Sequence, residues 1–158
     1  MVRFAVAAFA VVLTLAGCAT APVTTPPPTT TETTPDGAAG CAPASPISLG
    51  LPEVRGTPTH GDTSLFGWIM ADQPGIHTGS DIKIVWRMVG DGDLHVQLLA
   101  PDGTAHPLSW GPDAHGGSNY ERPGREWGTG IVLDAPGCWQ LNFTTDTTAA
   151  SVWLEATS

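Results

Sequence analysis

The chain has 158 residues, of which six are basic and fifteen are acidic, so its formal net charge at pH 7 is −9. A surface this acidic repels phosphate backbones and anionic lipid headgroups. The charge therefore excludes nucleic acids as partners, and it excludes attachment to a membrane through a basic patch on the protein. The length and the hydrophobic content of 41% suit one globular domain with one core.

Residues 1–17 have the organisation of a secretory signal peptide. Arg3 precedes an apolar run from Phe4 to Ala16, and small residues lead to Cys18. This run is shorter than the roughly 20 apolar residues that a membrane-spanning helix needs. The sequence Leu15-Ala16-Gly17-Cys18 resembles the lipobox of bacterial lipoproteins.

The lipobox resemblance implies a covalent membrane anchor. The thiol of Cys18 would receive a diacylglyceryl group, and cleavage before Cys18 would make it the lipidated first residue. Such an anchor is stable because each buried methylene contributes roughly 0.8 kcal/mol. The mature chain would hold five basic and fifteen acidic residues, a net charge of −10. We therefore expect an extracytoplasmic protein on the outer face of the cytoplasmic membrane; the alternative is a secreted protein whose Cys18 carries no lipid.

Residues 18–40 are expected to be the lipidated cysteine and a linker. From Ala19 to Gly40 the chain is rich in Pro, Thr, Ala and Gly and has no large apolar side chain. Such a segment buries too little surface to offset its conformational entropy. Its prolines favour extension at about 3.1 Å per residue, which would lift the following domain off the membrane.

Residues 41–158 are expected to form a single all-β domain. Ile82, Ile84, Trp86 and Met88 alternate with polar or smaller residues, which is the period of a strand with one buried face. Short runs of this kind recur between Gly, Pro and Asp residues. The predicted strands are Ile47–Leu51, Ser64–Met70, Asp81–Val89, Asp93–Ala100, Ala105–Trp110, Thr129–Leu133, Cys138–Thr144 and Ala150–Ala156.

Seven or eight short strands at this spacing predict an antiparallel β-sandwich. Gly90-Asp91-Gly92 is expected to be a hairpin turn, and Pro101-Asp102-Gly103 a second one. With Cys18 lipidated, Cys41 and Cys138 remain as an even pair, and we predict that they form a disulfide in an oxidising compartment. The alternative is two unpaired buried thiols.

Two motifs in the last third of the chain carry a second resemblance. Gly128-Thr129-Gly130 and Pro136-Gly137-Cys138-Trp139, followed by a short final strand, look like the Ig-like domains of uncharacterised Gram-positive surface lipoproteins. The resemblance implies an Ig-like sandwich and carries no activity. A true immunoglobulin disulfide is not expected, since Cys41 precedes the first strand.

The longest stretch without a strand signal runs from Trp110 to Gly128, and long loops are usually functional or disordered. Aromatic residues beside arginines and carboxylates are typical of a platform that binds a sugar or a peptide. The other interpretation is a packed cap in which tryptophans close the end of the sandwich and charges pair with one another. The candidate ligand-binding residues are Trp110, His115, Tyr120, Arg122, Arg125 and Trp127.

Sequence motifs for metal or cofactor binding are weak, and we predict neither a metal nor a cofactor. His60, His77, His95, His106 and His115 show no metal-ligand spacing. Acids near Asp91, Asp93 and Asp102 lack the EF-hand pattern and fit turns better than a calcium site. No nucleophile elbow, zinc-protease motif or phosphate loop occurs, so we expect no enzyme.

The sequence therefore favours a lipid-anchored binding or contact module of the bacterial cell envelope. A glycan or a protein is the expected ligand, and the membrane is reached through the lipid on Cys18. A structural or accessory envelope lipoprotein without a small ligand is the first alternative. A hydrolase that uses two carboxylates is the second, since carboxylates are plentiful.

Overall fold

The computed structural model describes residues 41, 43, 45, 47–48, 52–71 and 75–158. The chain divides into the units Met1–Pro35 and Asp36–Ser158, and all described residues belong to the second unit. The predicted signal peptide 1–17, Cys18 and the linker 18–40 lie outside them. The described residues contain no helix, and hence none long and apolar enough to cross a membrane.

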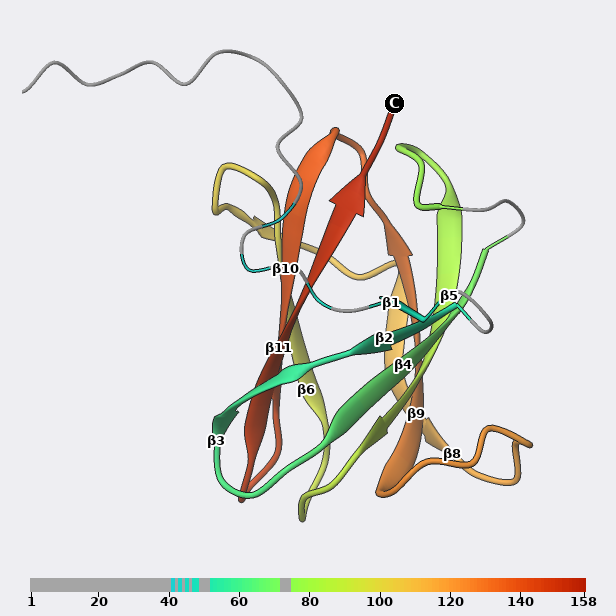
Figure 1. Cartoon of the computed structure of the whole chain (residues 1–158), viewed down its shortest axis with the longest axis vertical. Helices are drawn as coiled ribbons and strands as arrows, with labels where there is room; N and C mark the ends of the chain where they lie inside the picture. The colour runs from blue at the N-terminus through green and yellow to red at the C-terminus, as the bar shows by residue number, and fades with distance from the viewer. Residues whose placement is uncertain (1–40, 42, 44, 46, 49–51, 72–74) are drawn as a thin grey trace, which may run out of the picture. The chain divides into compact units, whose positions relative to one another are not determined.

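Eleven strands build the described part of the domain (Figure 1). They are β1 (Ile47–Ser48), β2 (Glu53–Arg55), β3 (Thr57–His60), β4 (Leu65–Met70), β5 (Asp81–Met88), β6 (His95–Leu99), β7 (Ala105–His106), β8 (Trp110–His115), β9 (Arg125–Val132), β10 (Gly137–Thr144) and β11 (Ala149–Ala156).

These strands form two sheets, and every strand pairs antiparallel with its neighbours. The six-stranded sheet has the order β1-β2-β4-β5-β9-β8, and the five-stranded sheet has the order β3-β11-β10-β6-β7. Their apolar faces pack together, so the predicted β-sandwich is confirmed. The Ig-like description of its topology stays a prediction.

One extended segment passes from the first sheet to the second. β2 and β3 are separated by Gly56 alone, yet β2 pairs with β4 and β3 pairs with β11 (Figure 1). A Cβ atom at Gly56 would lie 2.7 Å from Cδ2 of Leu65, so the corner has room only for glycine. Strands that switch sheets at a bend close the corner of a sandwich.

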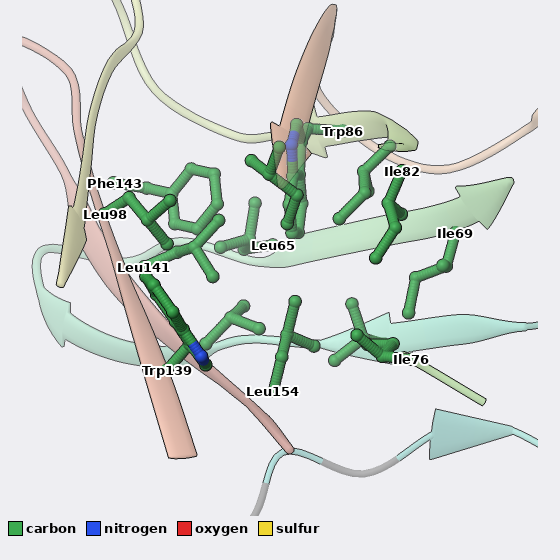
Figure 2. Packing of buried hydrophobic residues seen from close by; sticks show 14 of the residues in the cluster. Leu65, Ile69, Ile76, Ile82, Trp86, Leu98, Trp139, Leu141, Phe143 and Leu154 are labelled. Atoms are coloured by element: carbon green, nitrogen blue, oxygen red, sulfur yellow. The ribbon is translucent and has the colours of Figure 1, made fainter. Parts of the chain in front are cut away.

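The core lies between the sheets and includes Trp86 among side chains of both sheets (Figure 2). Its indole N–H donates to Oγ1 of Thr129 at 2.8 Å, and its ring contacts Phe143 of the other sheet at a centroid distance of 4.4 Å. A Cβ at Gly67 would lie 2.3 Å from Cζ3 of Trp86. A tryptophan is thus accommodated in the core because its neighbours supply a glycine beneath it and a hydroxyl for its only donor.

The four strands at the sheet edges are short or contain proline. β1 and β7 have two residues each, β3 contains Pro58, and β8 contains Pro112 beside a register shift between Trp110 and Asp113. Proline and bulges prevent an edge from pairing with another strand. Contacts of this domain are therefore expected through its faces and loops.

Two expectations about connections were wrong. The stretch from Trp110 to Gly128 is not one loop, because β8 and the first part of β9 lie within it and leave residues 116–124 as the connection. Gly90-Asp91-Gly92 is not a hairpin turn, since β5 and β6 belong to different sheets. The turn at Pro101-Asp102-Gly103 does join the antiparallel pair β6 and β7.

The predicted disulfide is present in the structure. Cys41 is bonded to Cys138 of β10 with a Cα–Cα distance of 5.2 Å and a sequence separation of 97. A few residues later, Oγ of Ser45 accepts a hydrogen bond of 2.9 Å from the backbone N–H of Trp153 in β11. The start of the domain is thus attached to two strands of the five-stranded sheet.

Removing this disulfide is expected to destabilise the domain substantially. A cross-link across 97 residues restricts the unfolded chain, by about 4–5 kcal/mol in the chain-entropy model. The double variant Cys41→Ala, Cys138→Ala should therefore unfold at a markedly lower urea concentration than the native chain. Tryptophan fluorescence during urea unfolding measures this difference, with Cys18→Ala as the control that keeps the disulfide. Equal midpoints would show that the cross-link contributes nothing.

Candidate functional site

The outer face of the six-stranded sheet, which points away from the five-stranded sheet, carries the candidate residues. Side chains of β2, β4, β5, β9 and β8 that are paired in register form rows across this face. One row is Arg55, Phe66, Arg87, Glu126 and His115. The next is Glu53, Trp68, Val85, Gly128 and Asp113, and the third is Met70, Lys83, Gly130 and Trp110.

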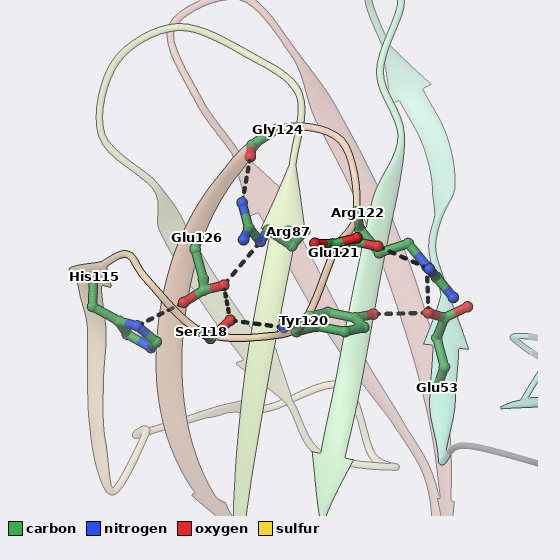
Figure 3. Close-up of polar contacts among 9 residues, drawn as sticks. All are labelled: Glu53, Arg87, His115, Ser118, Tyr120, Glu121, Arg122, Gly124 and Glu126. Atoms are coloured by element: carbon green, nitrogen blue, oxygen red, sulfur yellow. Dashed lines mark hydrogen bonds and ion pairs between the residues drawn. The ribbon is translucent and has the colours of Figure 1, made fainter.

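The connection 116–124 lies over part of this face and creates a second, smaller buried region (Figure 3). Tyr120 is buried and packs against Trp68 of β4, with ring centroids 5.7 Å apart. Val85 points outward from β5 yet is also buried. Arg122 places its guanidinium 5.6 Å from the centre of the Phe66 ring. A loop that covers a sheet with its own aromatic residue is a packed element of the fold.

A buried carboxylate, Glu53 of β2, binds the part of this connection that contains Tyr120 and Arg122. It is 1% exposed, and it accepts hydrogen bonds from the Tyr120 hydroxyl at 3.0 Å and from Nε of Arg122 at 2.6 Å (Figure 3). Burial alone would raise the pKa of Glu53. The hydrogen bonds from Arg122 and Tyr120, with the charges of Arg122 and Arg55, outweigh burial, so this pKa lies below its ordinary value.

The same contacts change the partners of Glu53. Burial, and then the hydrogen bond to Glu53, raise the pKa of the Tyr120 hydroxyl well above its ordinary value. The hydrogen bond to Glu53 also raises the pKa of the Arg122 guanidinium. All three groups therefore keep one protonation state across the neutral range, which suits a structural cluster better than proton transfer.

The second buried carboxylate, Glu126 of β9, binds the start of the connection through Ser118. It pairs with Nε of Arg87 at 2.9 Å and with Nδ1 of His115 at 2.7 Å, and Oγ of Ser118 donates to it (Figure 3). Arg87 also donates to the carbonyl of Gly124 at 3.1 Å. Because the carboxylate, and not the imidazole, stands between Ser118 and His115, this is not the arrangement of a serine-hydrolase triad.

Trp110 forms an exposed aromatic surface beside this cluster. Its indole lies across two glycines of β9: a Cβ at Gly130 would be 2.0 Å from Nε1 of Trp110, and one at Gly128 would be 3.1 Å from Cζ3. The residue is 36% exposed. Among the described residues, the indole N–H has no hydrogen-bond acceptor. The glycines thus hold one side of the indole against the sheet and leave the rest to solvent.

The six predicted ligand-binding residues separate into two groups in the structure. Trp110, His115 and Arg125 have exposed side chains. Tyr120 is buried in the connection, and Arg122 is bound to Glu53. Trp127 belongs to the core at 2% exposed, where Arg125 packs over its ring at 5.1 Å. The packed-cap interpretation thus describes Tyr120, Arg122 and Trp127, while a binding role of the other three stays a prediction.

Several residues of this face were missed by the sequence interpretation. Glu53 lies in a short Pro-Glu-Val-Arg stretch with no visible pattern. Arg87 occupies an outward position of a correctly predicted strand, and the alternation of that strand could have placed Arg87 on the outer face. Gly128 and Gly130 were noticed as a motif, but their role beneath Trp110 depends on the pairing of β8 with β9.

Groups considered as metal ligands have other roles. Among the described residues, no three His, Cys, Asp or Glu side chains come together to hold an ion. Asp102 accepts hydrogen bonds from the backbone N–H and the hydroxyl of Thr104, which lower the pKa of its carboxyl. His106 packs edge-on against Trp139 and lies 3.2 Å from Asp134.

The lowered pKa of Glu53 predicts acid sensitivity. A carboxyl group whose pKa is lower in the folded state contributes stability above its unfolded pKa, and this contribution disappears as the pH falls through the folded value. Stability should therefore fall as the pH drops below the ordinary value of 4.5. Glu53→Gln should lower the melting temperature at pH 7 by roughly 5 °C or more and flatten this part of the pH profile.

Thermal unfolding between pH 3 and pH 7 measures the effect. Asp113→Asn is the control, because it changes an exposed carboxylate on the same face. Parallel pH profiles for Glu53→Gln and the native chain would contradict the assignment.

Comparison with known proteins does not add to this geometry. No family model, no curated protein and no solved structure matches the chain. A function is therefore inferred from the side chains described above and from the sequence of residues 1–40.

Proposed function

We propose that this protein is a lipid-anchored extracytoplasmic module of the bacterial cell envelope that binds a glycan through Trp110. The exposed indole across Gly128 and Gly130 is the observation that carries the proposal. An indole offers a flat apolar surface to the C–H face of a sugar ring and one N–H donor to a hydroxyl group. Few other large apolar side chains are exposed on the described surface, which makes Trp110 the natural contact.

The lipid anchor and the extracytoplasmic location are both proposed from the sequence of residues 1–40. Cys18 follows the lipobox-like Leu15-Ala16-Gly17, and the Pro- and Thr-rich residues 19–40 would separate the lipid from the domain. An oxidising location agrees with the disulfide between Cys41 and Cys138. The net negative charge leaves the lipid as the means of attachment.

The polar groups beside Trp110 favour binding over hydrolysis. A glycosidase needs two carboxyl groups that face the same bond, one of them with a raised pKa. Glu53 of β2 and Glu126 of β9 are each paired with a cationic side chain of their own, Arg122 and Arg87, and the pKa of Glu53 is lowered. An accessory envelope protein without a glycan ligand remains the alternative, and it predicts no role for Trp110.

Trp110 is expected to be essential for binding and dispensable for folding. Trp110→Ala should abolish retention of the full chain on insoluble cell-wall glycan while leaving the melting temperature nearly unchanged, since the side chain packs on glycines at the surface. A sedimentation assay with purified cell wall measures retention. Trp153→Ala, which removes a half-buried tryptophan from the opposite face of the sandwich, is the matched control.

Gly130→Ala provides a second test that keeps the tryptophan. The new Cβ would lie 2.0 Å from Nε1 of Trp110, so the indole must move while the backbone need not. We expect reduced retention comparable to that of Trp110→Ala. Trp153→Ala, on the opposite face of the sandwich, is again the control and should bind normally. Normal retention of both Trp110→Ala and Gly130→Ala would refute the proposed platform.

Lipidation is tested separately from glycan binding. In cells fed an alkyne-labelled fatty acid, the native chain should incorporate the label and fractionate with membranes, because Cys18 supplies the acceptor thiol. Cys18→Ser should lose the label and the membrane association together. The double variant at Cys41 and Cys138 serves as the control for cysteine loss, and it should stay labelled. Label on Cys18→Ser would disprove the proposed anchor.

A further inference from the structure

A depression opens beside Trp110 at the end of the same face. Its volume is about 370 Å³, and it is lined by Arg87, His115, Gly116, Gly117, Arg125 and Glu126. It is adjacent to the indole because His115 and Trp110 meet above the same glycine. Nε2 of His115 lies 3.4 Å from the position of a Cβ at Gly128, and Cζ3 of Trp110 lies 3.1 Å from it.

The polar groups that reach solvent in this depression are mostly donors. The only acidic group in the lining is Glu126, whose side chain is 1% exposed and already paired with Arg87 and His115. Arg125 is 52% exposed, and its ion pair with Asp93 is long, at 3.9 Å. Nη1 of Arg125 also donates a hydrogen bond to the Gly92 carbonyl. A guanidinium has five N–H donors, so Arg125 keeps others that can bind an added acceptor.

His115 is oriented by the buried carboxylate. Its Nδ1 lies 2.7 Å from Oε1 of Glu126, so Nε2 is the ring nitrogen left for a ligand. The ring is 39% exposed at the mouth of the depression. Arg87 is held in place by Glu126 and by the Gly124 carbonyl. Two arginines and an oriented histidine thus surround one small space next to an aromatic surface.

We propose that this depression receives the carboxylate of an acidic sugar whose ring stacks on Trp110. The inference rests on the proposed glycan binding and adds the class of glycan. A carboxylate matches the forked donors of a guanidinium, and charge-assisted hydrogen bonds of this kind are stronger than neutral ones. The net charge of the domain opposes anionic ligands in general, so the local arginines are what select this one.

The test compares an acidic sugar with its neutral counterpart on the full chain in detergent micelles. Trigalacturonate and its methyl ester share their rings and differ in charge. NMR titration gives two separate reporters: the Trp110 indole N–H senses stacking, and the Gly116 and Gly117 amides sense occupation of the depression. We expect both sugars to shift the indole signal and only the acid to shift the two amides.

Affinities of variants complete the test. Arg125→Gln should weaken binding of the acid by about fivefold or more and leave the ester unaffected. Arg55→Gln is the matched control, because it removes the same charge from the outer face of the six-stranded sheet, outside the depression. Equal affinity of acid and ester, with a shifted indole, would overturn this inference and keep the proposed function. An unshifted indole with both sugars would overturn the two together.

Discussion

A carboxylate stays buried only when cationic or hydrogen-bonding groups surround it, and two such carboxylates organise the outer face of the six-stranded sheet. Glu53 on β2 holds Tyr120 and Arg122, and Glu126 on β9 holds Arg87, His115 and Ser118. The connection 116–124 is thereby attached to β2 through Glu53 and to β9 through Glu126. Breaking either cluster would leave a charge buried without partners, so the connection behaves as part of the folded domain. Glu126 in turn holds His115, whose ring lies next to Trp110 over Gly128.

The strands of this domain were predictable where alternation is regular and a core is formed on one side. Residues 81–89 and 138–144 show that pattern clearly, and β5 and β10 are found there. The disulfide was predictable because Cys41 and Cys138 are the two cysteines that remain once Cys18 is assigned to the lipid. In contrast, β8 has the sequence Trp-Gly-Pro-Asp-Ala-His and lies at a sheet edge with little burial, so no alternation marks it. β2 and β3 are too short to show a period and were hidden by the turn at Gly56.

The candidate site was less predictable than the fold because its contacts join residues distant in sequence. Glu53 meets Arg122 across a separation of 69 residues, and Arg87 meets Gly124 across 37. Composition indicated that aromatic residues and arginines gather between 110 and 128. It did not indicate which of them face inward, since that depends on the register of β9 with β5 and β8. Trp127 and Trp110 are alike in sequence terms, yet one is core and the other is surface.

β9 explains why the core and the platform are linked. Its inward residues Trp127, Thr129 and Ile131 fill the space between the sheets, and Thr129 accepts the hydrogen bond of Trp86. Its outward residues Glu126, Gly128 and Gly130 carry the buried carboxylate and support the Trp110 indole. Glycine in a strand interior weakens the strand, so two glycines at alternate outward positions indicate a surface that something must approach closely. Here the indole itself fills that space, and its remaining exposed face is what a ligand would meet.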